Sequence, residues 1–123
     1  GDFIALGADE RVETLVRRLK TSGRAEALIT NSDGRYRGLV RLQDVLDEPG
    51  TTRLADLARA DGVTFDERTT LWEAMTQLRD FIGEAAPLIG SDGRLLGVVP
   101  EGAVIGGYME AVHDLRREEN AGA

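Results

Sequence analysis

The four residues Ser-Asp-Gly-Arg occur twice in this chain, at positions 32–35 and 91–94. A glycine follows each copy, at Gly38 and Gly97, and the two copies are 59 residues apart. When the sequence is aligned with itself at this shift, apolar residues with the spacing of one helix face coincide without a gap. These residues are Val12, Leu15, Val16 and Leu19 in the first copy and Leu71, Ala74, Met75 and Leu78 in the second. The chain is therefore a tandem duplication, which restricts its fold more than any other feature.

Each copy has the pattern strand, helix, strand, turn, strand, helix, so the predicted fold class is α/β (α+β) with two small three-stranded sheets. Asp9 is expected to cap the first long helix, and Thr70 with Glu73 forms a capping box for its counterpart. Asp-Gly in each turn is expected to supply the positive φ angles of a tight hairpin. The hairpin strands are expected at 27–30 and 38–40, and at 87–89 and 95–99. A linker helix at 53–60 and a C-terminal helix from 104 to about 119 complete two domains, 1–59 and 60–123.

Composition excludes several classes of partner. The net charge of −7 argues against nucleic acid or an anionic membrane surface, because both need clustered positive charge. No apolar run reaches the roughly 20 residues of a transmembrane helix, so we expect a soluble chain that does not insert into a membrane. Because the chain begins at Gly1 without a methionine, we expect it to be an excised piece of a longer protein.

Catalytic and metal sites are not expected. The single histidine, His113, lies in the polar part of the expected C-terminal helix, and a general base normally sits in a pocket within reach of its substrate. The Ser32 and Ser91 hydroxyls belong to turns, and no G-x-S-x-G motif is present. The absence of cysteine excludes thiolate metal sites, and the Asp-Gly turns lack the alternating oxygen ligands of a calcium loop.

The duplicated unit resembles a CBS domain, and the pair resembles a Bateman module. The resemblance is carried by the turn, the glycine after it, two apolar residues and a short helix, which read SDGRYRGLVRLQD and SDGRLLGVVPEGA. It implies that the repeats are related by a pseudo-twofold axis with two clefts between their sheets. It also implies a regulatory module without catalytic activity.

The C-terminal part of the sequence resembles one particular group of CBS pairs. The segments LRDFIGEAAPLI and GVVPEGAVIGGYMEAVHDLRREEN resemble the end of the cytosolic CBS pairs on bacterial chloride channels and transporters of the ClC family. This implies that an upstream membrane domain is the partner, and that the pair lies on the cytoplasmic side of the inner membrane. The alternatives are a CBS pair, freestanding or attached to another protein, that senses an adenine nucleotide, and a purely structural dimerisation module.

A nucleotide cleft is the site that the resemblance implies. Asp44 occupies the position whose carboxylate binds ribose hydroxyls, and Arg41 replaces a threonine that contacts phosphate. The second copy has Pro100 and Ala103 there, so at most one cleft, with weak affinity for ATP, ADP or AMP, is expected, and no cofactor is required. The alternative is that Asp44 only caps or solvates a short helix. Leu39, Val63, Thr64 and Ala86 complete the implied cleft.

Self-association is expected as well, because the two half-domains carry more apolar surface than they cover alone. A homodimer is the expected state. The candidate interface residues are Trp72, Met75, Val104, Ile105 and Tyr108.

Overall fold

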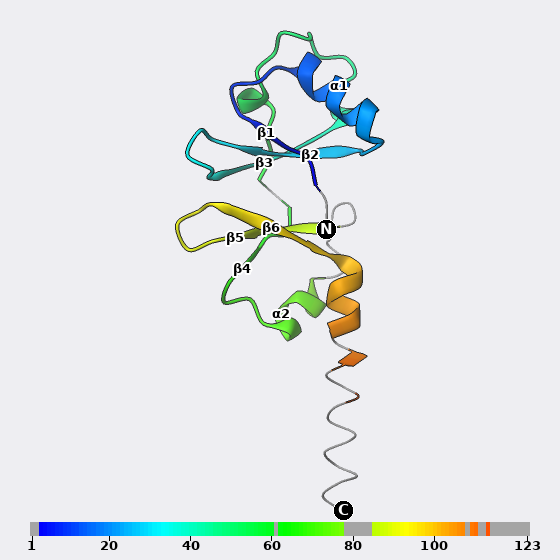
Figure 1. Cartoon of the computed structure of the whole chain (residues 1–123), viewed down its shortest axis with the longest axis vertical. Coiled ribbons are helices and arrows are strands. Elements are labelled where there is room, and N and C mark those ends of the chain that lie inside the picture. Colours follow the sequence, from blue (N-terminus) through cyan, green and yellow to red (C-terminus); the bar gives the residue numbers. More distant parts are fainter. Residues whose placement is uncertain (1–2, 61, 78–84, 108, 111–112, 114–123) are drawn as a thin grey trace, which may run out of the picture.

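Two small sheets, one from each copy, form the centre of the computed structural model, which describes residues 3–60, 62–77, 85–107, 109–110 and 113 (Figure 1). The first sheet has the order β1-β2-β3 and the second has the order β4-β5-β6. In both sheets the first two strands are parallel and the last two are antiparallel. The strands are β1 (Ala5–Gly7), β2 (Glu26–Thr30), β3 (Tyr36–Arg41), β4 (Phe65–Asp66), β5 (Ala85–Ile89) and β6 (Leu95–Pro100). The expected α+β fold and its duplication are confirmed.

Helices cover each sheet on the face away from the other sheet (Figure 1). The α-helices are α1 (Val12–Ser22) and α2 (Leu71–Thr76), and residues 101–107 and 109–110 form a further helix. The expected linker helix is only a short 3-10 turn, η2 (Leu54–Asp56), and another 3-10 turn, η1 (Leu42–Asp44), follows β3. The rest of the expected C-terminal helix lies outside the described residues, apart from residue 113, which is helical.

Within the described residues, more of the first core than of the second is seen. In the first repeat α1 buries Val12, Leu15 and Leu19 against the sheet, as its apolar spacing predicts. In the described part of α2 only Ala74 is fully buried. The buried residues of the first core are Leu6, Ala8, Val12, Leu15, Leu19, Ala27, Ile29, Val40, Val45 and Leu54. Those of the second core, within the described residues, are Phe65, Ala74, Ala86 and Val104.

The N-termini of the two long helices are satisfied in different ways. The capping box at α2 is confirmed: the Thr70 hydroxyl accepts from the Glu73 amide at 3.1 Å, and the Glu73 carboxylate accepts from the Thr70 amide at 3.3 Å. The expected cap by Asp9 is wrong. Arg11 is the N-cap residue of α1 without a side-chain bond, and Asp9 instead pairs with Arg53.

Carbonyl groups from a distant loop replace the missing cap of α1. The amide of Val12 donates to the carbonyl of Thr52 at 2.9 Å, and the amide of Glu13 donates to that of Gly50 at 3.0 Å. Free amides at a helix N-terminus need such acceptors. Since this loop supplies them, α1 needs no capping side chain.

In each hairpin turn, only the glycine has a left-handed backbone conformation. Gly34 and Gly93 both have φ of 86°, while no described residue other than glycine has a positive φ. The amide of Gly34 donates to the carbonyl of Asn31 at 3.0 Å, which makes a turn followed by a left-handed glycine. The expectation that aspartate also adopts a positive φ is therefore wrong. Asp33 instead accepts from the Arg35 amide at 3.2 Å.

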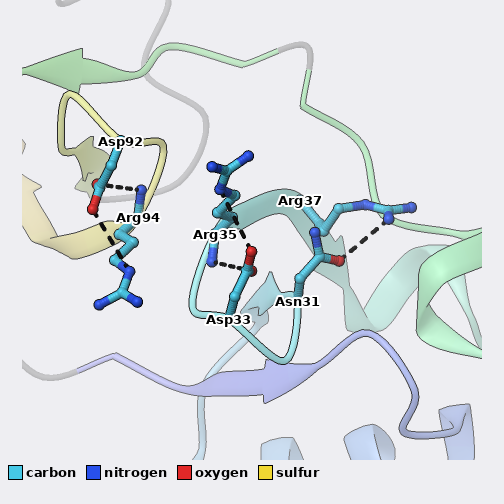
Figure 2. A network of polar contacts seen from close by, with 6 residues as sticks. All are labelled: Asn31, Asp33, Arg35, Arg37, Asp92 and Arg94. Carbon is cyan, nitrogen blue, oxygen red and sulfur yellow. Dashed lines mark hydrogen bonds and ion pairs between the residues drawn. The ribbon is translucent and has the colours of Figure 1, made fainter.

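The two turns hydrogen-bond to each other. The amide of Tyr36 donates to the carbonyl of Gly93 at 2.9 Å, and the amide of Leu95 donates to that of Gly34 at 3.1 Å. The two bonds are equivalent, because Tyr36 corresponds to Leu95 and Gly34 corresponds to Gly93 in the repeat of 59 residues. This is the symmetry expected of a pseudo-twofold axis through the junction. Figure 2 shows the two turns side by side, each with its own aspartate–arginine pair. The repeated turn is thus the contact that joins the repeats.

Candidate ligand pocket in the first repeat

A pocket of about 200 Å³ opens beside β3 and η1. It contains three of the residues expected at a nucleotide cleft: Leu39, Arg41 and Asp44. Its full lining is Leu39, Val40, Arg41, Asp44, Val45, Glu48, Leu57 and Arg59. Two arginines and two acidic residues therefore line one small cavity together with apolar residues.

The backbone places Arg41 and Asp44 next to one another. Arg41 ends β3 opposite Glu26 in the antiparallel register, and its Nε lies 3.9 Å from the Glu26 carboxylate. The chain then turns into η1, where the Leu42 amide donates to the carbonyl of Ala25 at 2.9 Å. Val45 is 2% exposed and anchors the end of this turn in the core, while Asp44 remains exposed to solvent.

The linker between the repeats forms another part of the pocket lining. Leu39 and Arg59 exchange two backbone hydrogen bonds, of 2.9 and 3.0 Å, as in an antiparallel bridge. Gly38 permits this approach, because a Cβ there would lie 2.5 Å from the carbonyl carbon of Arg59. The linker thereby contributes Leu57 and Arg59 to the pocket. Sequence reasoning missed both because it assigned 53–60 to a helix, and it missed Glu48 as well.

The other expected cleft residues do not line this pocket. Ala86 is 1% exposed and belongs to the second core, and Val63 packs against that core. Thr64 is exposed beside β4. Their part in a cleft therefore stays a prediction.

At three of the four charged positions of the pocket, the second repeat carries no charge. A shift of 59 residues relates Arg41 to Pro100 and Asp44 to Ala103. It also relates Glu48 to Gly107. Arg41, Asp44 and Glu48 of the pocket thus have no charged counterpart in the second repeat.

The expected interface residues fall into two groups. Trp72 and Ile105 are exposed, at 68% and 43% of their surface. Val104 is buried at 3% exposure and Met75 packs beside it, so both belong to the second core. Tyr108 lies outside the described residues. Sequence reasoning missed Met109, which is 61% exposed next to Ile105 on the same helix.

In the described part of the chain, no group of three or more histidine, cysteine, aspartate or glutamate residues could hold a metal ion. No helix within the same residues combines the length and apolar character needed to cross a lipid bilayer.

The duplicated unit of three strands with outer helices, paired at its turns around a pseudo-twofold axis, defines a tandem pair of small α+β domains. The family model for the CBS domain matches residues 1–50 and again 54–110, so the chain belongs to the CBS domain family. Comparison with curated proteins gave no match.

Solved structures share this fold. A CBS domain pair/ACT domain protein from Thermotoga maritima has a TM-score of 0.77 at 19% identity, covering 89% of this chain and 91% of that one. The cytosolic domain of the Mg²⁺ channel MgtE, in complex with ATP, has a TM-score of 0.71 at 22% identity, covering 84% and 44%. CbpB in complex with c-di-AMP has a TM-score of 0.77 at 15% identity, covering 95% and 83%. At these identities the similarity concerns the fold.

Proposed function

We propose that this CBS pair is a non-catalytic regulatory module that senses an adenine nucleotide through the pocket at Asp44. The observation that carries the proposal is the presence of Arg41 and Asp44 in one cavity with an apolar wall. A mononucleotide offers matching chemistry: an anionic phosphate, two vicinal ribose hydroxyls and a flat base.

Each wall of the pocket suits one part of that ligand. The Asp44 carboxylate accepts hydrogen bonds from both ribose hydroxyls, because it has two oxygens and no donor. The Arg41 guanidinium donates two parallel bonds to a phosphate. Leu39 and Leu57 offer apolar contact to the base. The pocket of about 200 Å³ is below the usual range of roughly 300–1,000 Å³ for small-molecule sites, which favours weak binding.

Two structural neighbours support the class of ligand. MgtE was solved with ATP and CbpB with c-di-AMP, and both ligands contain adenine nucleotides. A ligand can regulate the parent protein only by binding one arrangement of the module better than another.

The parent in this proposal is a membrane transport protein. The sequence resemblance of residues 78–120 favours a ClC-type chloride channel or transporter, and MgtE provides a precedent for a CBS-containing cytosolic domain on a channel. We further propose that the module self-associates through the exposed apolar side chains of the second repeat, Trp72, Ile105 and Met109. A homodimer beneath a membrane domain would transmit a ligand-dependent change to that domain.

Calorimetry with ATP, ADP and AMP tests the nucleotide proposal. We expect one site for each chain, with an affinity no tighter than high micromolar. The Asp44→Ala variant should lose at least tenfold in affinity, because a charge-assisted hydrogen bond contributes about 1.5–3 kcal/mol. Glu101→Ala is the control, since this exposed carboxylate lies in the second repeat. Tight binding that survives Asp44→Ala, or no binding of any of the three nucleotides, would contradict the proposal.

A further inference from the structure

Arg59 lines the pocket although it belongs to the linker between the repeats. Its amide and carbonyl are both bonded to Leu39, so the origin of the side chain is fixed relative to β3. Gly38 lies directly against the peptide bond between Arg59 and Ala60. Arg59 therefore has a fixed backbone at the edge of a cavity that Asp44 also lines.

The two arginines of the pocket differ in their ionic partners. Arg41 lies beside Glu26, with 3.9 Å between its Nε and the carboxylate, so part of its charge is already balanced. Among the described residues no carboxylate forms an ion pair with Arg59. Arg59 is also exposed, so its guanidinium can turn toward a ligand without first breaking an ion pair in that part of the chain.

We propose that Arg59 binds the phosphate of the nucleotide and thereby couples occupancy of the pocket to the docking of the linker on β3. This inference rests on the nucleotide-binding role proposed above. Arg59 precedes β4 by only a few residues, and the linker carries the second repeat. A phosphate held jointly by Arg59 and the first repeat strengthens the contact between the linker and β3. Ligand binding then favours the arrangement of the two repeats in which the linker is docked.

A comparison of AMP with adenosine isolates the phosphate contact. Titration calorimetry should show that the wild-type chain binds AMP more tightly than adenosine. Arg59→Ala should lower the affinity for AMP about tenfold or more and leave that for adenosine unchanged. Arg59→Lys should lose less, because it keeps the charge but not the planar pair of donors. Arg18→Ala on α1, an exposed arginine outside the pocket, is the control and should change neither affinity.

Hydrogen exchange at the Leu39 amide reports the coupling, because this amide donates to the Arg59 carbonyl. AMP should slow its exchange in the wild type and not in Arg59→Ala, whereas adenosine should have little effect in either chain. If AMP and adenosine bind equally well and Arg59→Ala changes neither, the role of Arg59 is overturned while nucleotide sensing stands. If neither compound binds the wild type, the proposed function falls and this inference with it.

Discussion

The first repeat has Arg41 and Asp44 in a pocket beside β3, and the second repeat has Pro100 and Ala103 at the equivalent positions. The hairpin turns, by contrast, are identical in the two repeats and hydrogen-bond to each other across the pseudo-twofold axis. A change in one turn would disturb the other as well, whereas a substitution at Arg41 or Asp44 leaves the hydrogen bonds of this junction in place. The duplication therefore keeps the backbone features that join its halves and allows the ligand-binding side chains to diverge.

The glycine that follows each turn also has different surroundings in the two repeats. Gly38 has φ of 134°, and a Cβ there would lie 2.5 Å from the carbonyl carbon and 2.6 Å from the oxygen of Arg59. Among the described residues, a Cβ on Gly97 would meet no atom within 4 Å, and its φ lies outside the left-handed region. The sequence pattern is the same, but only the first glycine lies against the linker in the described structure.

The largest expected effect follows from this difference. Gly38→Ala should lower the free energy of unfolding by about 2–4 kcal/mol, because it combines backbone strain with a clash against the linker. Gly97→Ala should change it by no more than about 0.5 kcal/mol, as at other positions without contacts. Urea denaturation followed by circular dichroism measures both variants. Equal losses would show that a segment also lies against Gly97 in solution.

The sequence predicted those structural features that depend on residues close together in the chain. Repetition of the turn and of the helix spacing predicted two equivalent sheets, and Thr70 with Glu73 predicted the cap of α2 because all its atoms lie within one helical turn. It did not predict the contacts whose two partners are far apart in the chain. The amides of α1 bond to a loop about forty residues away in the chain, which Asp9 could not indicate. Arg59 was missed for the same reason, since its strand-like pairing depends on the path of the linker.

The outer faces of the two long helices allow a second comparison. Glu13 on α1 and Trp72 on α2 occupy equivalent positions, and both are exposed. Trp72→Ala should weaken self-association at least tenfold, because a large aromatic side chain in an interface contributes about 2 kcal/mol or more. Glu13→Ala is the matched control and should leave the association unchanged. Sedimentation equilibrium near micromolar concentration measures both, and a monomeric wild type over the whole range would remove the basis for the comparison.

The smallest expected effects concern the two helix N-termini. Thr70→Ala should lower the free energy of unfolding by about 1 kcal/mol, because the Glu73 amide then loses its acceptor. Asp9→Ala should cost less than about 0.5 kcal/mol: its carboxylate caps no amide of α1, and its ion pair with Arg53 is largely exposed, at 81% and 54% for the two side chains. Thermal and urea unfolding of both variants under one buffer condition resolve a difference of this size. A loss at Asp9 as large as that at Thr70 would mean that Asp9 caps α1 in solution. The acceptors supplied by the loop would then not replace a capping side chain.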